Sequence, residues 1–182
     1  NPGGTLLLDP RNIYVRDSSI GGTTLTSDLT NVDQYADGST TSYRVNSSII
    51  ESAITSGTNV ILKAQRNIYV QSDIIATGSS GGDLTLNAGV DIDISANITT
   101  ANGNLTLEAN NESISGRGNN RYSDIDISST VNLGTGDLNI TLGNSNTTGS
   151  YDINLSTATI NANNITITDS ATNTSQPSDL GS

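Results

Sequence analysis

The amino-acid sequence predicts an all-β protein, a parallel β-helix of about six to seven coils with loop insertions and one short flanking helix. Aliphatic and polar residues alternate in short runs, which is the pattern of a strand with one buried face. These runs recur roughly every twenty residues, a period typical of solenoid repeats. Two pentapeptides also occur twice, RNIYV at 11–15 and 66–70 and DIDIS at 91–95 and 124–128.

Each predicted coil contains three short strands, seen most clearly in residues 81–102 and in the preceding residues 59–80. A single coil cannot bury its own apolar face, so the coils must stack on one another. The predicted first strands begin at Asn59, Asp83, Asn104, Asp137 and Asn164. The predicted core columns include Leu84, Leu86, Leu105, Leu107, Ile92, Ile94, Ile98, Val60, Leu62, Ile68 and Val70.

One helix is predicted, from Ile49 to Ser56. Ser48 and Glu51 have the spacing of a capping box, and Gly57 is placed to end the helix. We expect this helix to lie on the flank of the solenoid, with Ile50, Ala53 and Ile54 on one face.

The domain organisation follows from where the alternating pattern is broken. Residues 1–168 form the parallel β-helix segment, and residues 169–182 a polar flexible tail or linker. Insertions are expected at 22–58, 110–123 and 143–150. The last two fall between the first and second strands of their coils, so both should project from the same edge.

Composition and charge exclude several classes of partner. The 182 residues contain no Cys, Met, Trp, Phe or His, and seven basic against eighteen acidic residues give a net charge of −11. This balance argues against a nucleic-acid partner, because binding to phosphates requires Lys and Arg. No apolar run approaches the length of a membrane span, so membrane insertion is not expected.

The carboxylates Asp91, Asp93, Asp124 and Asp126 are the candidates for metal chemistry. If the coils stack in register they form an acidic patch, and Ca²⁺ prefers such oxygen ligands. The same positions are also typical of solvated residues that alternate with buried Ile, and the glycine–aspartate nonapeptide of calcium-binding β-rolls is missing. We therefore predict no metal ligand and no cofactor.

No enzymatic activity and no catalytic residue are predicted. Nucleophilic triads would lack a base, because His and Cys are absent. The acidic residues are scattered, whereas a glycosidase needs two carboxylates at a defined separation. In the two RNIYV copies, Arg and Tyr are interpreted as outward-facing residues of the second strand column.

Asparagine is abundant in Asn-x-Ser/Thr triplets, and two interpretations stay open. Such triplets are acceptors for glycosylation in secreted proteins. Asn also tolerates the left-handed backbone of solenoid corners. The triplets begin at Asn46, Asn97, Asn104, Asn111, Asn139, Asn146, Asn154, Asn164 and Asn173.

Three segments together resemble the filamentous haemagglutinin-type exoproteins of bacterial two-partner secretion. They are GGTLLLDPRNIYV, SSIIESAITSGTNVILKAQRNIYVQSDI and GGDLTLNAGVDIDISANITTANGNLTLEAN. The resemblance covers residues 3 to about 109, and the remainder more loosely. It implies a right-handed parallel β-helix on a large surface-exposed or released fibre that serves in adhesion.

The expected function is therefore a non-enzymatic structural or adhesive segment of a secreted fibre, at the bacterial outer-membrane surface or outside the cell. Its expected partner is a host or bacterial surface receptor or glycan, met by loops at 22–45, 110–123 and 143–150. The alternative is a filament subunit that stacks end to end through open β-helix ends.

The chain ends bear on this alternative. Terminal coils expose unpaired backbone groups, and neither the first eight residues nor the residues after Asn164 contain an evident capping element. We expect an internal piece of a longer fibre, with further coils or subunits stacked on at least one end.

Overall fold

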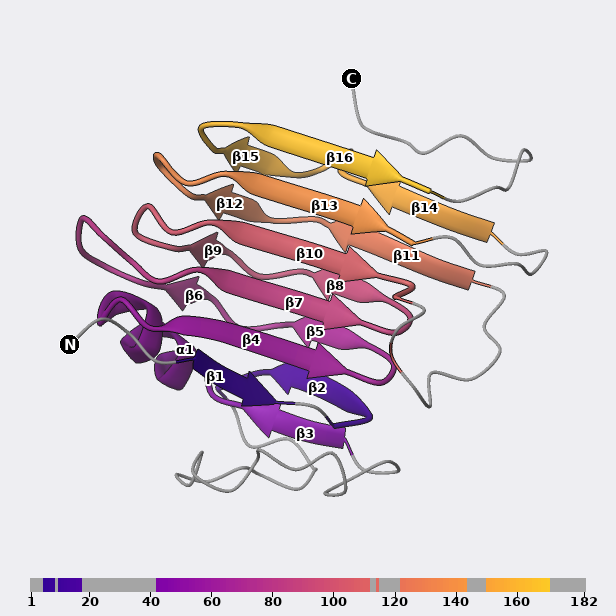
Figure 1. The fold of residues 1–182 in the computed structure, drawn as a ribbon, viewed down its shortest axis with the longest axis horizontal. Coiled ribbons are helices and arrows are strands. Elements are labelled where there is room, and N and C mark those ends of the chain that lie inside the picture. Colours follow the sequence, from indigo (N-terminus) through magenta and orange to yellow (C-terminus); the bar gives the residue numbers. More distant parts are fainter. Residues whose placement is uncertain are drawn as a thin grey trace.

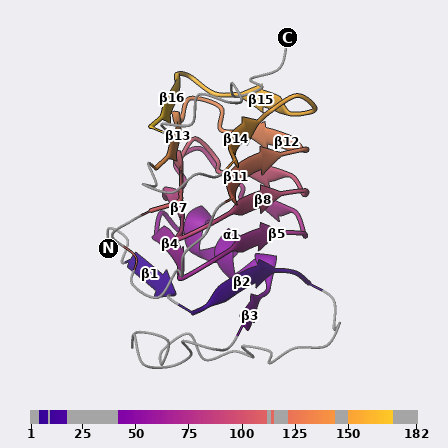
Figure 2. The same ribbon diagram turned by 90° about the vertical axis from the view of Figure 1, so that its right-hand side faces the viewer.

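The computed structural model describes residues 5–8, 10–17, 42–111, 114, 122–143 and 150–170. Within these residues there are sixteen strands and one helix. The strands form three parallel sheets, here called A, B and C. From β4 onward the chain runs through A, then B, then C before it returns to A, whereas before β4 it passes from A through two strands of B and the helix. Figure 1 shows the resulting stack of coils, and Figure 2 shows sheets A and B as separate layers along the same axis.

Sheet A has six strands, in the order β1 (Thr5–Leu8), β4 (Asn59–Ala64), β7 (Leu84–Ala88), β10 (Leu105–Ala109), β13 (Leu138–Leu142) and β16 (Ile165–Asp169). Sheet B has the order β14 (Ser150–Asn154), β11 (Tyr122–Ile127), β8 (Ile92–Ile94), β5 (Ile68–Val70), β2 (Asn12–Val15) and β3 (Ser42–Val45). Sheet C has the order β15 (Thr159–Asn161), β12 (Thr130–Asn132), β9 (Ile98–Thr99) and β6 (Ile74–Ile75).

The predicted core columns are confirmed. Equivalent residues of successive coils pair directly, as Val60 does with Leu84, Ile68 with Ile92 and Ile74 with Ile98. All eleven predicted core residues are fully buried. The predicted strand starts in sheet A agree with the structure to within one residue, and sheet A is six strands deep.

A column of glycines allows the coils to approach closely where the chain enters sheet A. A Cβ atom on Gly103 would lie 2.1 Å from the carbonyl oxygen of Gly82, and one on Gly136 would lie 2.2 Å from that of Gly103. No side chain fits at such distances, so glycine is required by the close backbone contact. In each case the glycine precedes the Asp or Asn that leads into the strand.

One strand lies inside the predicted insertion 22–58. Residues Ser42–Val45 form β3, which pairs in parallel with the outer edge of β2. Sheet B is therefore one strand longer at its N-terminal end than the sequence pattern predicts. The strand was missed because Val45 is its only buried residue, which gives no alternation to detect.

The helix α1 spans Ser47–Thr55, two residues ahead of the predicted start, and the expected capping box is not formed. Asn46 is the N-cap and makes no side-chain capping bond. The carboxylate of Asp17 instead accepts hydrogen bonds of 3.0 Å from the backbone N–H and the hydroxyl of Ser47.

The expected position of α1 on the flank is wrong. The helix lies against the outer edge of β6, the last strand of sheet C. Glu51 Oε1 accepts the N–H of Ile75 at 2.9 Å, and Thr55 Oγ1 accepts the N–H of Thr77 at 3.1 Å. The side chains of α1 thus take the hydrogen-bonding role of a further strand, and the helix covers this end of sheet C.

The other predicted boundaries shift slightly. The insertions expected at 110–123 and 143–150 do fall between strands of sheets A and B, but β11 already begins at Tyr122 and β14 at Ser150. Asp169 ends β16 and Ser170 donates its N–H to Leu142, so these two residues belong to the stack and not to the predicted tail 169–182. Residues 18–41, 115–121, 144–149 and 171–182 lie outside the described residues.

Replacing Ile94 by Asp should destabilise the protein strongly. Ile94 is fully buried on β8, between Val70 and Ile127 in the strand register, so the carboxylate would have no partner. We expect a loss of ~3 kcal/mol or more in the free energy of unfolding, measured by urea denaturation. Ile75→Asp is the matched control, because Ile75 is 43% exposed, and it should cost less than ~1 kcal/mol. Equal losses in both variants would contradict the stacked core.

Replacing Glu51 by Ala should loosen α1 from sheet C. The substitution leaves the N–H of Ile75 without its acceptor, at a cost of about 1 kcal/mol. The amide of Ile75 should then exchange its hydrogen faster, as measured by NMR. Glu51→Gln is the control, since it keeps a carbonyl oxygen at the same reach. Unchanged exchange in the alanine variant would show that the helix does not protect this edge.

Candidate functional site

The outward-facing side chains of sheet B form two columns, here called the first and the second column. Both change chemistry along the stack, from amide, hydroxyl, aromatic and arginine groups in the N-terminal coils to carboxylates in the later ones. The first column contains Ser42, Asn12, Asn67, Asp91, Asp124 and Asp152. The second contains Arg44, Tyr14, Tyr69, Asp93, Asp126 and Asn154.

Asn and Asp side chains connect successive coils in a way that the sequence analysis missed. In the first column, Asn12 Oδ1 accepts the backbone N–H of Asn67, and Asp91 Oδ1 that of Asp124, both at 3.2 Å. The residues that lead into sheet A do the same, each accepting the N–H of its equivalent in the next coil at 2.8–3.1 Å. These acceptors are Asn59, Asp83, Asn104 and Asp137. An Asn or Asp at the start of these strands, or directly before them, was the available signal.

The described asparagines that begin Asn-x-Ser/Thr triplets do not adopt the left-handed backbone that was one interpretation of them. Positive φ angles occur at Ala101, Asn102 and Asn110 among the described non-glycine residues, and none of these begins a triplet. Triplet asparagines act through their side chains instead, as Asn97 does when its Oδ1 accepts the N–H of Thr130. Asn111 uses its Nδ2, the atom that glycosylation would modify, to donate to side chains of neighbouring residues. Asn146 and Asn173 lie outside the described residues.

The predicted in-register stacking of the four carboxylates is confirmed, and it creates repulsion. Burial raises the pKa of Asp91 to about 6, and the nearby charge of Asp124 adds to the effect. Burial and then the charge of Asp126 raise the pKa of Asp93. Burial and then Asp152 raise that of Asp124. Across the described ranges, no group of three or more acidic side chains is arranged to hold a metal ion.

The two RNIYV copies lie side by side in the N-terminal part of sheet B. The rings of Tyr14 and Tyr69 stack with centroids 4.8 Å apart and an angle of 15° between their planes. The guanidinium of Arg16 lies 4.8 Å from the centroid of the Tyr14 ring, and its Nε donates to Gln71. The tyrosines thus face outward as expected, and their stacking holds both rings in place.

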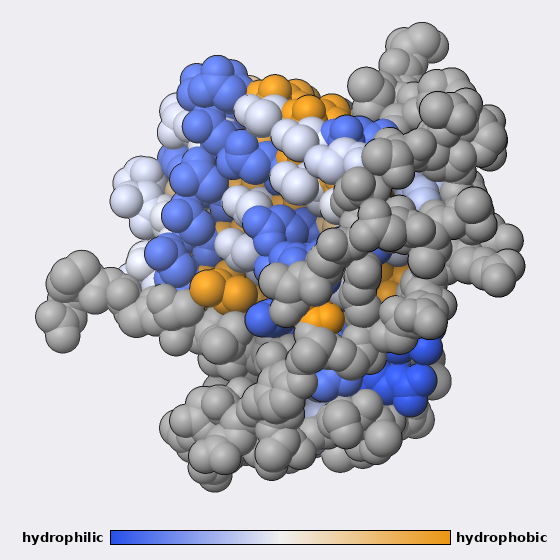
Figure 3. All heavy atoms as spheres, turned by 45° about the vertical axis from the view of Figure 1, so that its right-hand side comes forward, coloured by the Kyte–Doolittle hydropathy of each residue, from blue (hydrophilic) through white to orange (hydrophobic). Residues whose placement is uncertain are grey.

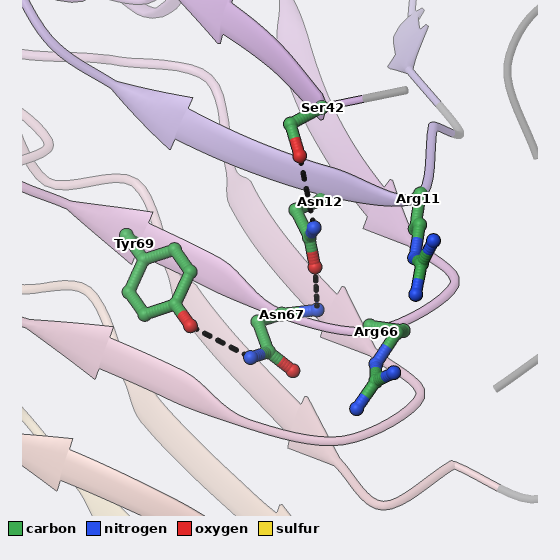
Figure 4. A pocket seen from close by; sticks show the side chains of 6 residues that line it. All are labelled: Arg11, Asn12, Ser42, Arg66, Asn67 and Tyr69. Atoms are coloured by element: carbon green, nitrogen blue, oxygen red, sulfur yellow. Dashed lines mark hydrogen bonds between the residues drawn. The ribbon is translucent and has the colours of Figure 1, made fainter. Parts of the chain in front are cut away.

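A pocket of about 210 Å³ lies beside this stack (Figure 4). Hydrogen bonds organise its wall, since Asn12 Nδ2 donates to Ser42 Oγ at 2.9 Å and Asn67 Nδ2 donates to Tyr69 Oη at 2.7 Å. Sequence reasoning missed the pocket, because one wall belongs to the unpredicted strand β3. The lining residues are Arg11, Asn12, Ser42, Arg66, Asn67 and Tyr69.

Comparison with protein-family models, with curated proteins and with solved structures gives no match. No helix of the described part of the chain has the length and hydropathy that crossing a bilayer requires. The surface seen in Figure 3 is mostly hydrophilic where residues are described, with a few separate hydrophobic areas. The geometry of sheet B and of the two ends of the stack is therefore the basis for assigning a function.

Replacing Asp91 by Asn should stabilise the protein at neutral pH. The pKa of about 6 in the folded state lies above the ordinary 3.8, so the folded chain binds this proton more tightly than the unfolded chain. Stability from this proton is complete below about pH 4 and is lost as the pH rises through about 6. We expect a gain of roughly 1–2 kcal/mol at pH 7 after allowance for solvent screening, and none at pH 4.

The measurement is urea denaturation of both proteins from pH 4 to 7. Asn should retain the hydrogen bond to the next coil, because Asn12 already makes the equivalent bond. Asp73→Asn is the control, since Asp73 accepts the N–H of Asn97 in sheet C, away from the carboxylate columns. An unchanged pH dependence in Asp91→Asn would contradict the stacked-carboxylate explanation.

Proposed function

We propose that the chain is a right-handed parallel β-helix segment of a large secreted bacterial surface fibre, with a structural and adhesive function and no enzymatic one. The stack of three parallel sheets and the resemblance to haemagglutinin-type exoproteins both support this proposal. The observation that carries it is the difference between the two ends of the stack.

At the C-terminal end the apolar columns continue to the surface. Ile165 of β16 is 50% exposed, whereas its partner Leu138 in the coil below is fully buried. Ile160 of β15 is partly exposed, whereas its partner Val131 is fully buried. Strands β14, β15 and β16 are the outermost strands of their sheets. A further coil would bury these side chains and pair these edges, which is the situation inside a continuing fibre.

The N-terminal end has a different shape, because α1 takes the place of a strand below β6. If two copies stacked head to tail, the outer edge of β15 would meet this helix instead of a strand. The contrast favours continuation by further coils over the alternative, a filament of stacked identical subunits. That alternative would require α1 to leave its position.

The adhesive part of the proposal rests on the edge between sheets A and B. Two of the predicted insertions, 110–123 and 143–150, lie at this edge, between β10 and β11 and between β13 and β14. A hollow of about 370 Å³ also lies there, lined by Glu108, Ala109, Asn110, Asn111, Thr141, Gly143 and Ser170. Side chains at such an edge remain accessible when further coils cover the ends, so a receptor or glycan can reach them along the whole fibre.

The test is immunogold electron microscopy of intact cells of the bacterium that makes the protein, with antibodies raised against the 182-residue chain. We expect gold particles on fibres outside the outer membrane, and loss of the label after protease treatment of intact cells. Label found only in sectioned cytoplasm would overturn the proposal.

A second measurement separates the fibre segment from the self-assembling subunit. The purified chain, examined by negative-stain electron microscopy over a range of concentrations, should form no long filaments, because its two ends do not match. Filaments of unlimited length that grow with protein concentration would favour the alternative.

A further inference from the structure

Within the described residues, two arginines in the pocket beside the tyrosine stack have no hydrogen-bond or ion-pair partner for their guanidinium groups. Arg11 and Arg66 occupy equivalent positions on successive coils, and the N–H of Arg66 donates to the carbonyl of Arg11 at 2.8 Å. Neither guanidinium donates a hydrogen bond or joins an ion pair within the described residues.

The two positive charges are held close together by the stacking. Their backbones are linked by a hydrogen bond between coils that lie about 4.8 Å apart. Figure 4 shows both side chains at the same end of the pocket. The charge of Arg66 acts on a carboxylate of the next coil, that of Asp91. It lowers the pKa of Asp91, but by less than burial raises it. Two adjacent guanidinium groups without hydrogen-bond or ion-pair partners among the described residues suit an anion, and their planar forks match a carboxylate.

The rest of the pocket wall offers hydrogen bonds that an inorganic anion would not use. Tyr69 Oη accepts a bond from Asn67, which leaves its own proton to donate. Asn67 Oδ1 is buried and receives no hydrogen bond. A buried acceptor without a donor costs free energy, so a ligand hydroxyl that donated to it would be favoured.

We propose that this pocket binds a saccharide unit that carries a carboxylate, with Arg11 and Arg66 on the carboxylate and with Asn67 and Tyr69 on the sugar hydroxyls. The volume of about 210 Å³ is below the range of ~300–1,000 Å³ typical of clefts for drug-sized ligands, which fits one sugar ring at a time. The proposal deepens the adhesive function and rests on it for its biological meaning, because it names the ligand class that a fibre would contact.

The experiment is isothermal titration calorimetry of the whole chain with four probes. Methyl glucuronide carries the carboxylate and the hydroxyls, methyl glucoside only the hydroxyls, acetate only the carboxylate, and glucose 6-sulfate a different anion. We expect millimolar binding of methyl glucuronide, and binding of the other three that is weaker by at least about tenfold.

The double variant Arg11→Gln/Arg66→Gln should weaken methyl glucuronide binding by at least about tenfold. Lys63→Gln is the matched control, because it removes one positive charge from sheet A, outside the pocket, and it should leave binding unchanged. Since neither guanidinium has a hydrogen-bond or ion-pair partner among the described residues, the double variant should keep the native circular dichroism spectrum and melting temperature.

Four results would overturn the proposal. They are absence of methyl glucuronide binding, equal affinity in the double variant, equal affinity for methyl glucoside or acetate, and tighter binding of glucose 6-sulfate. Each concerns the pocket alone. Surface labelling of the fibre would still be observed in that case, so failure of this site can be told apart from failure of the proposed function.

Discussion

In-register parallel pairing of each coil with the next is the constraint on which the rest of this structure depends. Backbone hydrogen bonds fix the register, as when Leu84 pairs with Leu105 and Ile92 with Ile125. Equivalent side chains are then held about 4.8 Å apart, one coil above another. Every position must therefore tolerate a neighbour of its own kind. Aliphatic residues satisfy this condition inside the stack, and glycine satisfies it where backbones meet, as at Gly103.

Polar residues satisfy the same condition with different success on different sheets. Before the strands of sheet A, the acceptor side chains alternate between amide and carboxylate, so that Asn104 separates Asp83 from Asp137. There the hydrogen bonds from Asn163 and Asn164 lower the pKa of Asp137. In sheet B the later coils place carboxylates directly above one another without an amide between them. Partial burial is the main reason that their pKa values are raised, and repulsion between the stacked carboxylates, which the lack of alternation causes, adds to it.

The same constraint explains how much the sequence could predict. Columns were predictable because buried positions such as Val60 and Leu84 repeat with a regular spacing that survives insertions. The position of α1 was not predictable, because capping signals are local. The side chain of Glu51, by contrast, binds the backbone of Ile75, 24 residues away. The pocket needed β3, a strand with one buried residue. The repeat of RNIYV could have predicted that two arginines lie next to each other, since identical segments in successive coils place identical side chains side by side.

If the chain is a segment of a fibre, as proposed, the asymmetry of its ends determines which surfaces a partner could reach. An open stack gains stability with each added coil, because every new coil buries the apolar column of the one before it. In a continuing fibre the end at Ile165 is thus consumed by further coils and is no recognition surface. In such a fibre the outer face of sheet B would stay exposed at any fibre length. It carries the tyrosine stack and the arginines of the pocket, near the N-terminal end of the stack. In the proposed fibre, recognition on the side and growth at the end would therefore use different surfaces, and neither would limit the other.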